Sequence, residues 1–224
     1  MTEGLDDALV GVRHTVSVDQ RVAIERSAVR LAEEFAGVFE FDTVQRFLIS
    51  SYDQLAVTAK VPNYLPLLAE RFTRQRLRAR AKAEGRADSR IPAVLFLCSH
   101  NAGRSQMALG FFADIVGDLA VGWSGGSAPD AAIDPRVIDA MAERGVDITT
   151  EFPKPWTDEV VQAADVVVDM GCGDTRPARS GHRYEVWDLA DPAGQSIDRI
   201  RAIRDEIEQR VRLLVADLDL SGHH

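Results

Sequence analysis

The sequence predicts two parts of different class: an all-α three-helix bundle, then an α/β domain with a four-stranded parallel sheet flanked by helices. Three observations predict this division. Apolar residues recur at helical spacing over residues 15–84. Short continuous apolar runs, typical of buried parallel strands, begin at residue 93. Helical patterns alternate with these runs, which favours parallel strands joined by right-handed crossovers.

Composition shifts along the chain set the predicted boundaries. The segment 85–92 is small and polar and reads as a linker, with Gly85 near its start and Pro92 at its end. We therefore expect an N-terminal tail at 1–14, the bundle at 15–84 and the α/β domain at 93–220. Whether the terminal "SGHH" is native stays open.

Capping patterns predict where the three helices of the bundle begin. Ser17 and Gln20 have the spacing of a capping box. Asp42 is expected to cap the second helix and Asn63 the third, with Pro66 tolerated in the first turn of that helix. Small bundles often self-associate, so a homodimer through this domain is an option that no residue decides.

The third helix ends in "RFTRQRLRARAKAEGR", which raises the alternative of a DNA-recognition helix. Three arginines, Arg71, Arg74 and Arg78, lie on one side of the helix, while Arg76 and Arg80 point roughly the opposite way. They form no single stripe for a DNA groove. The net charge of −9 also argues against general nucleic-acid binding. We favour a solvated helix whose cations suit the negative end of the helix dipole.

The second half alternates strands and helices. The predicted strands are 93–98, 119–125, 164–170 and 183–187. A helix is predicted up to about Val116, and another where Asp134 at the N-cap and Pro135 after it precede a stop at Gly145. A last helix spans about 196–218, with apolar residues on one side.

Composition and cysteine content limit the compartment. No apolar run reaches the roughly 18 residues that a membrane span needs. The start "MTEGLDDALVGVRH" is acidic and lacks the features of a signal peptide. We expect a cytoplasmic protein without membrane contact, in which two cysteines are inert or catalytic and not a disulfide framework. No Cys/His spacing matches a zinc site, so no metal is predicted.

An anion-binding loop is predicted directly after the first strand. Cys98 stands at the carboxyl end of that strand, where ligands bind in open α/β sheets. The loop leads into a helix start, whose free N–H groups and positive dipole end suit a tetrahedral oxyanion. The predicted oxyanion-binding residues are Ser99, His100, Asn101, Ala102, Gly103, Arg104 and Ser105.

Individual residues of this loop have expected roles. Helix starts and nearby cations favour a thiolate, so Cys98 is a candidate nucleophile; the alternative is a small buried hydrophobe. Arg104 has a planar fork for two oxygens, and Ser105 is expected to donate to the thiolate. Gly103 allows a close approach of the backbone. Asn101 is expected to bond its own backbone, and we favour a role for His100 in shaping the loop over anion contact.

Cys98-x5-Arg104-Ser105 after an apolar strand resembles the signature of the low-molecular-weight tyrosine phosphatases. The longer run "CSHNAGRSQMA" is more similar to the arsenate reductases built on that fold. Three further segments resemble reductase segments in the same order, and the resemblance covers about residues 93–218. The helical half resembles the three-helix domain of some actinobacterial members. The three reductase-like segments are "DPRVIDAMAERGVDIT", "KPWTDEVVQAADVVVDMGCGD" and "RYEVWDLADPAGQ".

The resemblance implies a chemistry for these residues. Arsenate would bind in the loop as phosphate does, and Cys98 would attack arsenic. Asp191, which precedes Pro192, would protonate the leaving hydroxide. From the local sequence alone, Asp191 fits a turn equally well, and Asp188 is the nearest competitor. A phosphatase instead hydrolyses its phosphocysteine with water and needs no second thiol.

The second cysteine, Cys172, follows the third strand and lies at the same sheet edge as Cys98. The resemblance makes it a candidate resolving thiol, but Arg176 stands where thioredoxin-coupled relatives usually have a third cysteine. Three alternatives stay open. In the first, mycothiol attacks the Cys98 adduct and mycoredoxin completes the cycle. In the second, a Cys98–Cys172 disulfide is reduced by thioredoxin. In the third, Cys172 is structural and the protein is a phosphatase or a non-catalytic oxyanion or redox sensor.

No bound cofactor is expected in any of these alternatives, and the reductant is an external thiol. His182 lies with Arg176, Arg179 and Arg183 in the loop after Cys172. The cluster would either lower the pKa of Cys172 or form a solvated surface, and we favour the surface.

Overall fold

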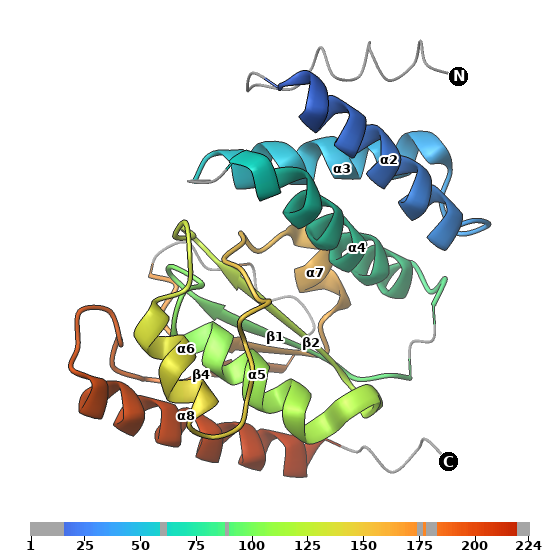
Figure 1. Ribbon diagram of the computed structural model, residues 1–224. Coiled ribbons are helices and arrows are strands. Elements are labelled where there is room, and N and C mark those ends of the chain that lie inside the picture. The colour runs from blue at the N-terminus through green and yellow to red at the C-terminus, as the bar shows by residue number, and fades with distance from the viewer. Residues whose placement is uncertain (1–15, 59–61, 88–89, 174–176, 178–182, 219–224) are drawn as a thin grey trace. The chain divides into compact units, whose positions relative to one another are not determined.

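The computed structural model of the protein describes residues 16–58, 62–87, 90–173, 177 and 183–218 (Figure 1). The chain divides into two compact units, Met1–Ala87 and Asp88–His224. This division falls inside the segment 85–92 that the sequence predicts as a linker. The predicted tail at 1–14 lies outside the described residues. Among the helices that the structure describes, none is long and apolar enough to cross a membrane.

The first unit contains the three helices that the sequence predicts. A 3-10 turn at Pro62–Tyr64 leads directly into the third of them. Apolar side chains from all three helices are fully buried, which explains how short helices become stable by packing. The helices are α2 (Val18–Glu34), α3 (Phe41–Ala56) and α4 (Leu65–Ala83).

One of the three predicted caps is present and two are wrong. Ser17 and Gln20 form the reciprocal capping box at the start of α2. Helix α3 begins at Phe41, so Asp42 lies in its first turn, where its charge suits the dipole but cannot cap. Asn63 lies inside the 3-10 turn, so its backbone is already helical and the N-cap position passes to Tyr64.

The arginines of α4 are engaged within their own unit. Arg74 and Arg78 both contact Glu34 of α2, at 2.6 and 2.9 Å. On the opposite side, the buried guanidinium of Arg76 donates to the hydroxyl of Ser51 and stacks over the ring of Phe47. These contacts give the cations a role in holding the bundle together.

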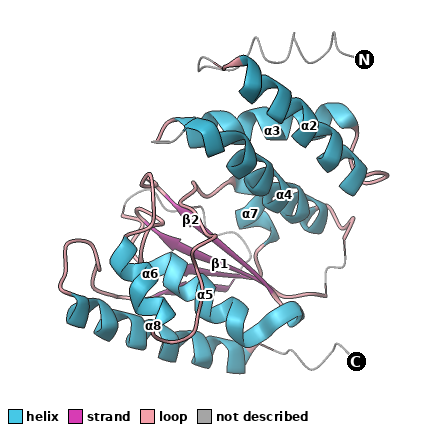
Figure 2. Ribbon diagram, viewed as in Figure 1, coloured by secondary structure: helices cyan, strands magenta, loops and turns pink. Residues whose placement is uncertain are grey.

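The second unit is built on a parallel sheet, whose strands are magenta in Figure 2. The strand order is β2-β1-β3-β4. All six residues of β1 and all four of β3 are buried, as the apolar runs predict. The register pairs Cys98 with Gly126 and Leu97 with Asp169, so the carboxyl ends of three strands lie together. The strands are β1 (Ala93–Cys98), β2 (Val121–Gly126), β3 (Val166–Asp169) and β4 (Arg183–Val186).

Helices cover both faces of this sheet. Figure 1 shows α5, α6 and α8 on one face and α7 on the other. Asp134 caps α6 through the amide of Arg136, as predicted, and Ser196 caps α8. The short helix α7 was not predicted from the residues. The helices are α5 (Arg104–Val116), α6 (Pro135–Ala142), α7 (Asp158–Ala163) and α8 (Ile197–Asp217), with a 3-10 turn at Gly117–Leu119.

Candidate active site

The end of β1 and the start of α5 enclose a short loop. β1 ends at Cys98, and α5 begins at Arg104 with Gly103 as its N-cap. No side chain caps this helix start. The first-turn N–H groups and the positive end of the dipole therefore face the loop, as an anion site requires.

The sulfur of Cys98 receives hydrogen bonds from two neighbours. The backbone N–H of Asn101 donates to Sγ at 3.2 Å, and the Ser105 hydroxyl lies 2.9 Å from it. Because the Asn101 amide donates to Ser105 Oγ at 2.8 Å, the hydroxyl hydrogen of Ser105 is free to point at the sulfur. Two hydrogen-bond donors therefore face the buried sulfur.

Asn101 holds the loop in shape by contacts outside it. Its φ of 48° is left-handed, a conformation that Asn adopts more readily than most residues. Its Oδ1 accepts from the backbone N–H of Lys154 at 2.9 Å and from Gln106 at 3.2 Å. The predicted bond between this amide and its own backbone is therefore wrong, because the amide reaches the segment before α7 and the helix α5.

The remaining loop residues are tied to neighbouring segments. The Ser99 hydroxyl donates to the carbonyl of Gly171 at 2.6 Å. His100 is exposed, and its carbonyl accepts from Asp130. The carbonyl of Ala102 accepts from the backbone of the residue that caps α6. These bonds fix the loop from three sides before any ligand arrives.

Gly103 is required by a close neighbour. A Cβ at this position would lie 2.6 Å from Cγ of Pro192. The sequence predicts that this glycine lets the backbone come close to a bound group. In the structure, the missing Cβ also makes room for the ring of Pro192. The loop that carries Asp191 therefore packs directly against the anion loop.

Arg104 and Asp191 are brought together from distant parts of the chain. Nη2 of Arg104 lies 2.6 Å from Oδ2 of Asp191, and Nη1 donates to the carbonyl of Leu189 at 3.3 Å. The arginine side chain is nearly buried, while the carboxylate is about half exposed. The fork is thus positioned at the rim of the loop, next to the residue that the resemblance makes the acid.

Cys172 is buried at the same edge of the sheet. Both cysteines are free thiols. Burial raises the pKa of the Cys172 thiol to about 12; the charges of Asp169 and Cys98 act in the same direction, and Arg104 opposes them. Cys98 influences the pKa of Cys172 because the two residues lie close together. Ser99, which follows Cys98, donates to the carbonyl of Gly171, which precedes Cys172. In the resting protein, Cys172 is therefore a protonated thiol.

Several predicted neighbours of Cys172 are not described. Arg176, Arg179 and His182 lie outside the described residues. Arg183 is described, and its guanidinium pairs with Glu185 and Asp217. Within the described part of the chain, no group of three or more His, Cys, Asp or Glu residues could hold a metal ion.

Sequence reasoning missed three residues that support the site. Lys154 is 1% exposed, and its ammonium group contacts Ser124 and the carbonyl of Phe152. Gln106 ties the loop to the same carbonyl. The third residue, Asp169, is an acid inside the apolar run "VVVDM", and that interruption was the one signal in the sequence.

Comparison with known proteins places the fold and the loop in a family. The chain belongs to the low molecular weight phosphotyrosine protein phosphatase family, whose model matches residues 93–223. Residues 24–81 match the N-terminal domain of protein-tyrosine-phosphatase-like proteins.

Individual relatives are arsenate reductases. A solved thioredoxin-dependent arsenate reductase of Corynebacterium glutamicum is 43% identical, with a TM-score of 0.80 over 89% of this chain and 98% of that one. A glutaredoxin arsenate reductase of Synechocystis is 34% identical over 129 residues, which are 56% of this chain and 97% of the relative. A putative arsenate reductase of Halobacterium salinarum is 33% identical over 52% of this chain and 85% of the relative.

Proposed function

We propose that this protein is an arsenate reductase that converts arsenate to arsenite with electrons from an external thiol. One observation carries the proposal: two free cysteines lie at the same sheet edge, one of them inside an anion loop. A phosphatase of this family needs only the first thiol. The reductases among the relatives support the same conclusion.

In the proposed reaction, the loop and Arg104 bind the arsenate oxygens and Cys98 attacks arsenic. Asp191 donates a proton to the departing hydroxide, which leaves as water and yields an adduct with an S–As bond. Cys172 then attacks the sulfur of Cys98. The electron pair of the S–As bond stays on arsenic, which is reduced to arsenite, while the two thiols are oxidised to a disulfide.

A reductant must then open this disulfide. We infer that thioredoxin acts directly on the Cys98–Cys172 bond, because Arg176 replaces the usual third cysteine of the relay. The thioredoxin-dependent relative supports this choice. Mycothiol with mycoredoxin is the alternative route, in which Cys172 is dispensable. We place the reaction in the cytoplasm, as the sequence predicts.

A side-by-side assay tests the proposal. Purified protein receives arsenate with either the thioredoxin or the mycothiol/mycoredoxin system, and arsenite is measured. We expect arsenite with thioredoxin, and its loss in Cys98→Ser and Cys172→Ser. Full activity of Cys172→Ser with mycothiol would instead select the mycothiol/mycoredoxin route. If the protein hydrolyses aryl phosphate but forms no arsenite with either system, the proposed function is wrong and the protein is a phosphatase.

A further inference from the structure

A buried carboxylate stands beside the resolving thiol without a role in the reaction above. Asp169 is the last residue of β3 and is 0% exposed. Its Oδ1 accepts the backbone N–H groups of Gly171 and Cys172, both at 2.9 Å. Its Oδ2 accepts the hydroxyl of Tyr184 at 3.0 Å. Burying an ion is costly, so these three donors compensate part of the cost of keeping the charge here.

The strand register explains how Tyr184 reaches this acid. Tyr184 on β4 pairs with Val167 on β3. Residues two apart on a strand point to the same face, so Val167 and Asp169 share a face and the long phenol spans the gap between them. The position of the carboxylate is thereby fixed from the neighbouring strand and from its own turn.

The same carboxylate lies at Cys172, because its Oδ1 holds the backbone N–H of that residue at 2.9 Å, and after burial its charge and its hydrogen bond to the thiol raise the pKa of the thiol. A thiol that bonds to a carboxylate directs its hydrogen at an oxygen, so a proton path of one step already exists. Among the described residues, Cys98 also disfavours the ionisation of Cys172, and Arg104 favours it. The thiol itself is 2% exposed, which leaves bulk water a poor proton acceptor.

We propose that Asp169 is the base that takes the proton of Cys172 as this sulfur attacks Cys98, with Tyr184 as a positioning residue for the carboxylate. The inference rests on the proposed function. In the step, the S–H bond of Cys172 breaks toward Asp169, the S–S bond forms and the S–As pair remains on arsenic. When an external thiol later releases Cys172 as a thiolate, the proton returns from Asp169 and the cycle closes.

The test isolates the thiol step from arsenate chemistry. Reduced protein is mixed with 5,5′-dithiobis(2-nitrobenzoate), which places one thionitrobenzoate on Cys98 and releases another. Attack of Cys172 on Cys98 then releases the second thionitrobenzoate and forms the disulfide, and the absorbance of the released product gives the rate. Mass spectrometry assigns the disulfide. Because arsenate is absent, this rate is independent of whether arsenite is formed in the assay above.

Asp169→Asn keeps an acceptor for the two backbone N–H groups but cannot take a proton. We expect it to slow the second release about 100-fold, the typical scale of general base catalysis. Its rate should then rise tenfold per pH unit, because hydroxide has to replace the base. Asp165→Asn is the matched control: Asp165 bonds the backbone N–H of Ala93 at the other end of β3, and its loss should leave the rate unchanged.

The opposite outcome is equally clear. If Asp169 acted only through its charge, its removal would ease the ionisation of Cys172 and the second release would be as fast as in the wild type or faster. Either result overturns the proposal, as does the absence of a second release in the wild type. Tyr184→Phe gives a second test that keeps the base. The carboxylate of Asp169 loses the hydroxyl donor that stabilises its charge. The pH dependence of the rate of the second release should therefore move to higher pH.

Discussion

Nη2 of Arg104 lies 2.6 Å from Oδ2 of Asp191, so the guanidinium proposed to bind the oxyanion and the proposed acid are already paired in the free protein. An anion that binds in the loop competes with the carboxylate of Asp191 for the guanidinium of Arg104. Asp191 is therefore expected to act in two ways, as the proposed acid and as a competitor of the anion for Arg104.

Asp191→Asn should separate these two effects. Without the acid, kcat for arsenite formation is expected to fall by about 10²–10⁴-fold, the range for loss of a general acid. Without the competing charge, inorganic phosphate should inhibit more tightly. Steady-state assays with phosphate as inhibitor measure both. Asp188→Asn is the control, because this exposed side chain lies three residues away and should change neither value; unchanged turnover in Asp191→Asn would refute the assigned role.

The contact between Gly103 and Pro192 should set the distance between the anion loop and the acid. In Gly103→Ala the new methyl group would meet Cγ of Pro192 at 2.6 Å, so one of the two segments must shift. A displacement of about 1 Å can cost about 100-fold in rate, and we expect a loss of about 10- to 100-fold in kcat.

Pro192→Ala provides the matched partner for this change, because it removes the ring that the methyl group meets. In a double-mutant cycle, the Gly103→Ala/Pro192→Ala protein should recover most of the kcat lost in Gly103→Ala. Equal activity of the single and the double variant would show that the close approach is not the cause. The same cycle by thermal unfolding separates a loss of stability from a loss of geometry.

The sheet and the loop that leads from β1 into α5 were predictable because their causes are local. A continuous apolar run predicts a buried strand, and the residues after Cys98 have the composition of a helix start that binds anions. The caps at Asp42 and Asn63 failed because packing of the bundle moved the helix starts by one or two residues. Local preference is a weak constraint where tertiary contacts decide.

The contacts that hold the site residues in place were not predictable, because they depend on which strands and loops become neighbours in the fold. Lys154 and Asn101 are 53 residues apart, and the backbone N–H of Lys154 donates to the side-chain Oδ1 of Asn101. Tyr184 meets Asp169 only because β4 pairs with β3 in one register. No spacing pattern encodes such meetings, since they follow from the order of the strands.

Asn101 allows backbone strain to be separated from side-chain contacts. Both Asn101→Ala and Asn101→Gly lose the amide that orients Ser105 and bonds Lys154, so both should lose activity to a similar degree. The left-handed φ of 48° suits Gly and costs Ala about 1–2 kcal/mol. We therefore expect the Gly variant to be the more stable of the two in urea unfolding. Equal stability would show that the loop relaxes around Ala.

Cys172 should make the protein less stable at high pH. Its pKa is raised from 9.0 to about 12 in the folded state, so an unfolded chain loses this proton first. Between pH 9 and 12 the unfolded state binds fewer protons, and the free energy of unfolding falls as the pH rises. The difference in urea midpoint between the wild type and Cys172→Ser should change over pH 8–10.5, in the direction of a less stable wild type. A difference that is constant over this range would contradict the raised pKa.

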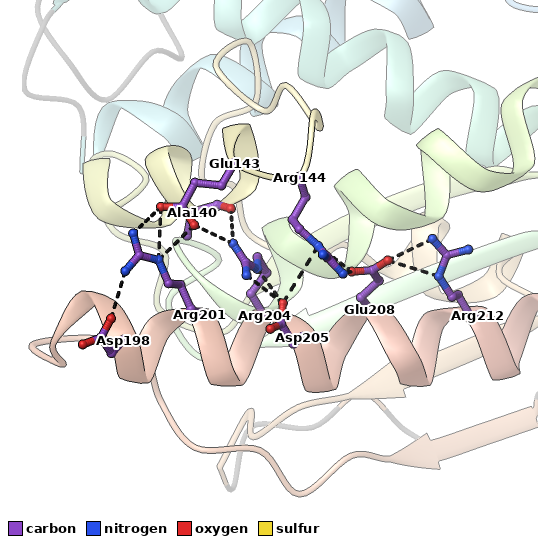
Figure 3. A network of polar contacts seen from close by, with 9 residues as sticks. All are labelled: Ala140, Glu143, Arg144, Asp198, Arg201, Arg204, Asp205, Glu208 and Arg212. Atoms are coloured by element: carbon purple, nitrogen blue, oxygen red, sulfur yellow. Dashed lines mark hydrogen bonds and ion pairs between the residues drawn. The ribbon is translucent and has the colours of Figure 1, made fainter.

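The ion network between α6 and α8 should determine stability in acid. Figure 3 shows Glu143, at the end of α6, between Arg201 and Arg204 of α8. The hydrogen bonds from Arg201 lead the effects that lower the pKa of Glu143 from 4.5 to about 2. Its contribution to stability is therefore complete above pH 4.5 and is lost as the pH falls toward 2.

Glu143→Gln should therefore unfold more easily than the wild type near pH 6, with the difference shrinking as the pH falls from 4.5 to 2. Urea unfolding at a series of pH values measures this difference. Asp198→Asn is the control, since Asp198 pairs with the same Arg201 but its side chain is 87% exposed, and exposed pairs contribute about 0–1 kcal/mol. If both variants follow the wild type at every pH, the network contributes nothing to holding α6 on α8, and the apolar contacts of the core alone hold these helices together.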